Sequence, residues 1–278
     1  MIEIIEENKK TNIKAVKENQ IINFELEINE FDTQHFGIIM ANLNENHTID
    51  ISKFKIDDIE KIFEVVIKQC KIKRINHIAL KTATKDYKII HAAEKKGFVL
   101  ENVSVEYAFD YSVEKIRDIT SLCKIRESTK DDLKTVLAIS KDTFKNFSRF
   151  HYDENLSNQK ADELYEKWVI NSFKGYADRI LVAENNGEVV GFCTLKNNFV
   201  NIQGEKACGA ILAGVSPNAR GLGVYKAMIN EAIKLGSKLS NVRYIASSTQ
   251  AQNIFVQRAW SELGLKIYCC KYIFHKIL

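Results

Sequence analysis

One short segment combines a proline, an arginine and closely spaced glycines between an apolar stretch and an amphipathic one. It reads Gly214-Val215-Ser216-Pro217-Asn218-Ala219-Arg220-Gly221-Leu222-Gly223-Val224-Tyr225. Gly221 and Gly223 let backbone N–H groups turn into the loop without obstruction from a Cβ atom, and a helix beginning there adds the positive end of its dipole. Arg220 adds a fixed charge. The segment predicts a diphosphate-binding loop, with a tight strand-to-helix turn as the alternative.

Two other phosphate-binding motifs fit this chain less well. A P-loop requires GxxxxGK[ST], and none of Gly204, Gly209 and Gly214 leads into a Lys-Ser or Lys-Thr pair at the required spacing. A dinucleotide-binding fingerprint would need a third glycine where Lys226 stands and an acidic residue where 246–248 read Ala-Ser-Ser. Neither nucleotide fold is therefore predicted.

Alternating strands and helices surround the loop in the second half of the chain. Asn-Gly at 186–187 predicts a hairpin turn, because these residues tolerate the positive φ angles of a tight turn. Apolar runs and helical periodicity predict the other elements. The expected strands are 123–126, 180–184, 189–196, 207–215, 243–247 and 267–274, and the expected helices are 128–144, 159–173, 253–263 and one ending near 238.

The first half predicts a smaller α/β domain with a polar linker, 111–121, after it. Its expected strands are 24–28, 37–43, 77–80 and 103–109, and its expected helices are 57–71 and 86–96. We therefore predict two domains, 1–121 and 122–278, built on a mixed sheet. Both halves end as strand, helix, glycine, strand, with Gly97 corresponding to Gly264, which indicates either a degenerate duplication or a coincidence of two ordinary αβ units.

The charge and composition of the chain limit the kinds of binding partner and the compartment that we expect. The net charge of +4 is too small to indicate nucleic-acid binding, but 1–122 carries 18 basic against 21 acidic residues and the remainder 22 against 15. The apolar stretch 207–215 is far shorter than the ~20 residues of a membrane span. The start, MIEIIEENKK, lacks the features of a secretory signal, and the cysteines form no CxxC pair. We expect a cytoplasmic protein with reduced thiols, no metal and no membrane partner; homodimer formation is left open.

The loop resembles motif A of the GNAT superfamily of N-acetyltransferases, in which an apolar-Val-x-Pro strand end precedes Arg/Gln-x-x-Gly-x-Gly/Ala. Arg220, Gly223 and the strand end 213–217 match, whereas Tyr225 replaces the final small residue. The resemblance extends over 123–278 and implies a GNAT fold there, a degenerate GNAT-like domain before it, and acetyl-CoA as co-substrate. It implies that these residues hold the coenzyme: Leu212, Ala213, Gly214, Val215, Arg220, Gly221, Leu222, Gly223, Val224, Tyr225, Asn253 and Val256.

Two segments outside the loop carry a closer resemblance. Within 143–175 the chain reads SRFHY and LYEKWVIN, and 31–37 reads FDTQHFG. Both are similar to segments of the TDP-fucosamine acetyltransferases, bacterial enzymes that N-acetylate an amino sugar carried on a nucleotide. This resemblance implies a nucleotide-linked amino sugar as the acceptor and places Arg149 and Tyr152 in its pocket. A surface position for both residues is the alternative.

Acetyl transfer from a thioester requires a neutral amine, stabilisation of the oxyanion and a proton for the departing thiolate. The resemblance implies a tyrosine donor in the helix 253–263, but Trp260 occupies that position, and an indole N–H is not a usable acid. Tyr268, Tyr225 or water could supply the proton, and His151 could act as the base. Transfer to a peptide or small amine, and a non-catalytic coenzyme A-binding module, remain alternatives.

Overall fold

The structure is a computed structural model that describes residues 2–7, 10–47, 50–145 and 148–278. Its contacts divide the chain into two compact units. Unit 1 comprises Met1–Ser104, Arg149–Lys160 and Cys270–Leu278, and unit 2 comprises Val105–Ser148 and Ala161–Cys269. The units are discontinuous, unlike the contiguous domains predicted from the sequence, because strands β6 (Val99–Asp110) and β12 (Lys266–Ile277) each have residues in both.

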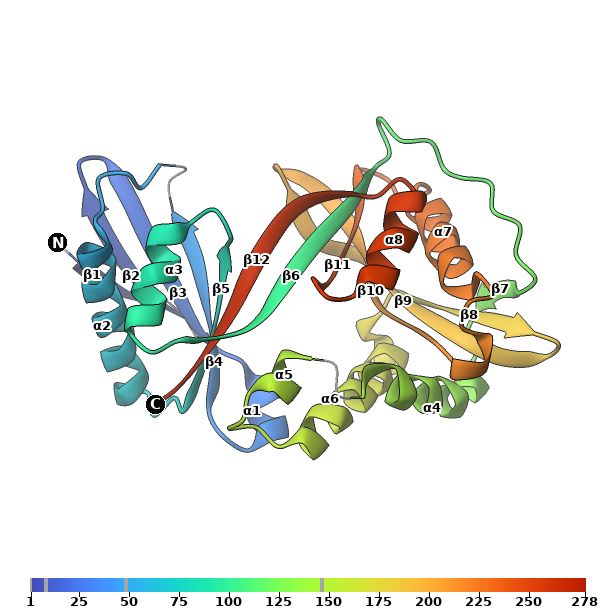
Figure 1. Cartoon of the computed structure of the whole chain (residues 1–278), viewed down its shortest axis with the longest axis horizontal. Coiled ribbons are helices and arrows are strands. Elements are labelled where there is room, and N and C mark those ends of the chain that lie inside the picture. The colour runs from blue at the N-terminus through green and yellow to red at the C-terminus, as the bar shows by residue number, and fades with distance from the viewer. Residues whose placement is uncertain (1, 8–9, 48–49, 146–147) are drawn as a thin grey trace. The chain divides into compact units, whose positions relative to one another are not determined.

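Unit 1 is built on strands in the order β1-β2-β3-β4-β5-β12 (Figure 1). Neighbouring strands are antiparallel except β4 and β5, which are parallel. The bounds of its own strands are β1 Ile2–Glu7, β2 Lys10–Lys17, β3 Gln20–Ile28, β4 Met40–His47 and β5 His77–Ala83. Sequence patterning did not predict β1 and β2.

Helices α2 (Ile56–Ile72) and α3 (Tyr87–Lys95) bury one face of this sheet. Phe24, Phe63 and Leu80 lie in the resulting core, and the rings of Phe24 and Phe63 are 5.1 Å apart. Successive side chains of a strand point to opposite faces. The β5 residues flanking Ile78 and Leu80, including His77, therefore point away from this core.

The strand predicted at 37–43 begins only at Met40 in the structure. A short helix, α1 (Glu30–Phe36), precedes it. The Asn29 side chain accepts the backbone N–H of Asp32 at 3.0 Å and so caps the helix. Gly37, at φ 74°, ends it by donating its N–H to the Thr33 carbonyl. The helix therefore ends at Gly37, where the apolar pattern predicted the start of a strand.

Unit 2 has strands in the order β12-β6-β11-β10-β9-β8-β7 (Figure 1). The predicted hairpin is confirmed, since Asn186 and Gly187 have φ angles of 51° and 84° between β8 and β9. The strands have the bounds β7 Lys124–Glu127, β8 Arg179–Asn185, β9 Glu188–Ile202, β10 Glu205–Val215 and β11 Tyr244–Gln250. The mixed α/β class predicted from the sequence is thus confirmed.

Helices accompany this sheet close to their predicted positions. They are α4 Leu133–Phe144, α6 Asn158–Asn171, α7 Val224–Gly236 and α8 Ile254–Glu262. A four-residue helix, α5 (Arg149–Tyr152), belongs to unit 1. The predicted helix from 128 begins instead with a 3-10 turn, Lys130–Asp132, because Asp132 accepts the Thr129 backbone N–H.

Gly97 and Gly264 both adopt positive φ between a helix and a strand. No helix within the described residues is long and apolar enough to cross a bilayer.

Candidate functional site

Strands β10 and β11 separate part-way along their length. Parallel pairing joins Ala207–Gly209 to Tyr244–Ala246, whereas β10 continues to Val215 beside β9. Its register against β9 shifts between Ala210 and Ala213. Beyond Gly209, the described residues show no pairing of β10 with β11, so one edge of β10 faces a gap. Extended backbone at such an edge can pair with an elongated ligand.

Side chains hold the irregular part of β10 in place. Thr194 Oγ1 accepts the Leu212 backbone N–H at 3.0 Å, and Ser247 Oγ donates to the Ala210 carbonyl at 2.7 Å. Both contacts compensate for ladder bonds that a register shift interrupts. The predicted positions from Leu212 to Val215 therefore lie on the part of β10 that borders the gap.

The predicted glycine loop connects this edge to α7. After the turn Pro217–Ala219, Gly221 and Gly223 have φ angles of 80° and 75°. Such angles favour glycine, and a Cβ atom on either residue would meet no heavy atom within 4 Å of the described structure. The glycines are therefore required by backbone conformation and border open space.

The start of α7 offers unpaired donors to an anion. Gly223 is its N-cap and supplies no side-chain hydrogen bond, so the first N–H groups of the helix lack the usual cap. Arg220 is exposed, and its Nε donates to the Val215 carbonyl at 3.4 Å, beside the same loop. An uncapped helix start next to a guanidinium fits a diphosphate. With the open edge of β10, this arrangement fits coenzyme A.

Asn253 and Val256 lie at the start of α8, which follows β11. The Asn253 side chain donates from Nδ2 to Thr249 Oγ1 at 2.9 Å, which fixes the direction of its amide oxygen. Val256 is half-buried, whereas its neighbour Phe255 is 85% exposed. Both predicted residues belong to the same unit as the glycine loop, but their contact with coenzyme stays a prediction.

Trp260 is a packed core residue. It is 2% exposed, and its ring lies 5.3 Å from that of Tyr107. Burial raises the pKa of Tyr225 most, the Cys193 thiol raises it further and Trp260 lowers it, so Tyr225 lies beside the indole. Sequence spacing gave no signal of this contact between α7 and α8.

Tyr268 is the other candidate proton donor. It is 40% exposed, and burial of its hydroxyl followed by the charge of Glu106 raises its pKa well above the ordinary value for tyrosine. Like an ordinary tyrosine, the phenol is protonated at neutral pH, and its raised pKa makes it a weaker acid. Burial raises the pKa of Tyr225 as well, so both hydroxyls carry a proton at neutral pH and both are weaker acids than an ordinary tyrosine.

The predicted acceptor residues share helix α5. Arg149 lies with its guanidinium carbon 4.5 Å from the centre of the Phe150 ring, and Tyr152 is 40% exposed. His151, the predicted base, is half-buried on the same helix. All three belong to unit 1, whereas the glycine loop belongs to unit 2.

Unit 1 also contains a buried group that sequence reasoning missed. His77, Asp153 and His275 place ligand-type atoms within 4.8 Å of one another. They are separated by 76 and 122 positions in the chain, so no local spacing pattern could have revealed them.

Residues 137–265 match the Acetyltransferase (GNAT) family. These residues form a GNAT acetyltransferase domain. The GNAT domain thus contains the open edge of β10, the glycine loop and α8. The predicted family is confirmed for this part of the chain.

Curated relatives match part of this chain. The spore coat polysaccharide biosynthesis protein SpsD of Bacillus subtilis (strain 168) is 24% identical over 144 residues, which are 52% of this chain and 47% of that protein. An uncharacterized N-acetyltransferase, MJ1207, of Methanocaldococcus jannaschii is 32% identical over 115 residues, 41% of this chain and 48% of the relative. The chain thus spans about half the length of these relatives.

Solved structures resemble the fold over almost the whole chain. A GCN5-related N-acetyltransferase from Sphaerobacter thermophilus superposes with a TM-score of 0.64 at 11% identity, covering 97% of this chain and 80% of that one. A tandem GNAT protein from the clavulanic acid biosynthesis pathway gives 0.54 at 8% identity, covering 96% and 82%. At these identities the comparisons establish the fold alone.

Proposed function

We propose that the chain transfers the acetyl group of acetyl-CoA to the amine of a nucleotide-linked amino sugar. The main support for transferase activity is the open edge of β10, which leads directly into a glycine loop and the uncapped start of α7. An extended thioester arm fits the edge, and a diphosphate fits the loop. No metal takes part in this proposal.

Each part of the site has a role in the transfer. Gly221, Gly223 and Arg220 bind the diphosphate, and a backbone N–H between Ala213 and Val215 stabilises the oxyanion formed when the amine attacks the thioester carbonyl. The C–S bond then breaks, the amine loses a proton and the thiolate gains one. Tyr268 donates that proton in this proposal, because its side chain is partly exposed and belongs to the same unit as the glycine loop.

The acceptor class rests on different support. SpsD is named for polysaccharide biosynthesis, and the segments around Arg149 and residues 31–37 resemble enzymes that acetylate nucleotide-linked amino sugars. Arg149 and Tyr152 on α5 would then bind the acceptor, with His151 receiving the amine proton. A small-molecule acceptor of this kind needs neither a nucleic-acid nor a membrane partner.

A thiol-release screen tests the proposal. Acetyl-CoA would be offered with TDP- and UDP-linked amino sugars, peptides and polyamines, and free coenzyme A measured. We expect release with a nucleotide amino sugar, strongly reduced in Arg220→Ala. Arg179→Ala is the matched control, because Arg179 pairs with Glu127 on the surface, away from the loop.

The other outcomes select other functions. Turnover only with peptides or polyamines would reject the amino-sugar acceptor and leave the transferase. Coenzyme A binding without release for any amine would indicate a coenzyme A-binding module, the function that the replacement of the expected tyrosine by Trp260 favours.

A further inference from the structure

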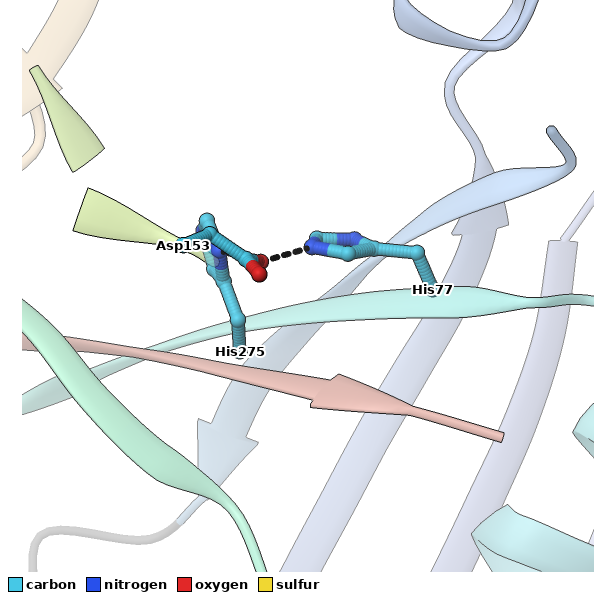
Figure 2. Close-up of side chains that lie close together, drawn as sticks. All are labelled: His77, Asp153 and His275. Carbon is cyan, nitrogen blue, oxygen red and sulfur yellow. Dashed lines mark hydrogen bonds and ion pairs between the residues drawn. The ribbon is translucent and has the colours of Figure 1, made fainter. Parts of the chain in front are cut away.

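Unit 1 buries two histidines around one carboxylate (Figure 2). His77 Nε2 lies 3.0 Å from Asp153 Oδ2, and His275 Nδ1 lies 2.8 Å from the same oxygen. The exposed fractions of the three side chains are 1%, 1% and 2%. Buried polar side chains of this kind are costly unless they are fully partnered or bind a ligand.

We propose that His77, Asp153 and His275 bind one divalent transition-metal ion through Nε2, Oδ2 and Nδ1. Two imidazoles and one carboxylate are a donor set typical of zinc, iron, cobalt and manganese sites. With metal–ligand bonds of about 2.1 Å, neighbouring ligands of an octahedral ion lie about 3.0 Å apart. The two observed N···O separations are close to that spacing, and all three ligand atoms lie within 4.8 Å of one another.

The carboxylate is held in a ligating orientation. Asn155 donates both its backbone N–H and its side-chain Nδ2 to Asp153 Oδ1, each at 3.0 Å. These bonds occupy Oδ1 and turn Oδ2 toward the two imidazoles. Hydrogen bonds that orient a ligating carboxylate in this way are a regular feature of metal sites.

The strands fix the two histidines on one side of the sheet. His77 begins β5 and His275 lies near the end of β12, and these strands pair antiparallel with Ile277 opposite His77. Phe274 points into the core under α2 and α3, so its neighbour His275 points to the other face, as His77 does. The imidazoles therefore meet at the same place, with ring centroids 4.5 Å apart.

The tautomers of the histidines are free to change. Nδ1 of His77 and Nε2 of His275 are buried and have no hydrogen-bond partner within the described residues. In the ion-free state each ring donates its N–H to Asp153; on metal binding that proton moves to the other ring nitrogen. Because no acceptor awaits it, we expect an affinity about 10–100-fold below that of a site with second-sphere partners for both histidines.

Charged groups of both signs lie near the site. The Asp32 side chain interacts electrostatically with His77, and Glu101 interacts with Asp153. Burial lowers the pKa of His275, and the positive charge of Arg149 lowers it further. A divalent cation would relieve the repulsion between Glu101 and Asp153 and offset the burial of the Asp153 charge.

The ligands come from each of the three segments that compose unit 1. His77 belongs to Met1–Ser104, Asp153 to Arg149–Lys160 and His275 to Cys270–Leu278. A bound ion would cross-link these segments, so its expected role is structural. No cysteine takes part, so the spacing of cysteines in the sequence could not indicate this site.

Metal titration of the purified full chain tests the proposal. After removal of metal with EDTA, we expect one equivalent of Co(II) to bind with visible d–d absorption bands, Zn(II) to displace it, and Zn(II) to raise Tm. His77→Gln and His275→Gln keep an amide that can donate to Asp153 but should each lose at least about 90% of metal binding. His91→Gln, on the exposed side of α3, is the matched control and should bind normally.

Three results would overturn the metal site. The first is binding of less than about 0.1 equivalent of Co(II) or Zn(II) by the wild-type chain at 100 µM metal. The second is equal metal binding by wild type and both glutamine variants. The third is a Co(II) X-ray absorption spectrum that shows no histidine ligands. The first and third need no variant, so they remain decisive if the variants do not fold. None depends on acetyl transfer, so the proposed function can fail independently.

Discussion

Replacing Gly223 with alanine separates backbone strain from coenzyme binding. At φ 75° an L-residue costs about 1–2 kcal/mol, and no neighbouring heavy atom within 4 Å would add a clash. For a chain of this size we expect Tm to fall by roughly 2–8 °C. The strain also rotates the first N–H groups of α7, and loss of one charge-assisted hydrogen bond to a diphosphate costs about 1.5–3 kcal/mol.

Gly187→Ala provides a closely matched control. Gly187 has φ 84° and also borders open space, but it lies in the hairpin between β8 and β9. Both variants should lose similar thermal stability, measured by circular dichroism. Only Gly223→Ala should weaken acetyl-CoA binding, by about 10-fold or more in calorimetric titration. Equal coenzyme affinity in the two variants would refute the assignment of the diphosphate to this loop.

Three further predictions concern the acid, a salt bridge and a close contact. Tyr268→Phe should lower kcat about 100-fold with little change in the KM for acetyl-CoA; an unchanged kcat would exclude Tyr268 as the donor. Hydrogen bonds from Arg126 hold the pKa of Asp132 at about 2, below its ordinary 3.8, so this pair stabilises the fold above pH 4 and is lost as the pH falls toward 2. Between pH 6 and pH 3, the free energy of unfolding measured with urea should fall by about 1 kcal/mol more in wild type than in Asp132→Asn. Gly236→Ala would place a Cβ 2.2 Å from the Tyr111 hydroxyl oxygen and should destabilise by about 1–3 kcal/mol, partly relieved by Tyr111→Phe; additive effects of the two changes would contradict this contact.

The glycine loop was predictable because its determinants are local. Gly221 and Gly223 adopt the positive φ angles that their spacing indicated, and the apolar strand and amphipathic helix on either side have almost the predicted bounds. The Asn186–Gly187 turn followed in the same way. Each of these features depends on residues a few positions apart, so one sequence is sufficient to find them.

Features that depend on distant residues were not predictable. The pairing of β10 with β11 stops at Gly209, and the register of β10 against β9 shifts between Ala210 and Ala213, but no residue type marks either position. Asp153 meets His77 and His275 only after three separate segments fold together. The side-chain environment of Trp260, including Tyr107 and Tyr225, likewise joins three elements. In each case tertiary packing decides the result.

The passage of β6 through both units limits how this chain can be divided for expression. A fragment beginning at residue 122 would contain the glycine loop but would lack Val105–Asp110, whose Phe109 is fully buried and whose Tyr107 packs on Trp260. Such a fragment would expose the apolar side of α8 to solvent and would be prone to aggregate. A recombinant GNAT domain should therefore begin before Val105, and failure of the shorter fragment would say nothing about its chemistry.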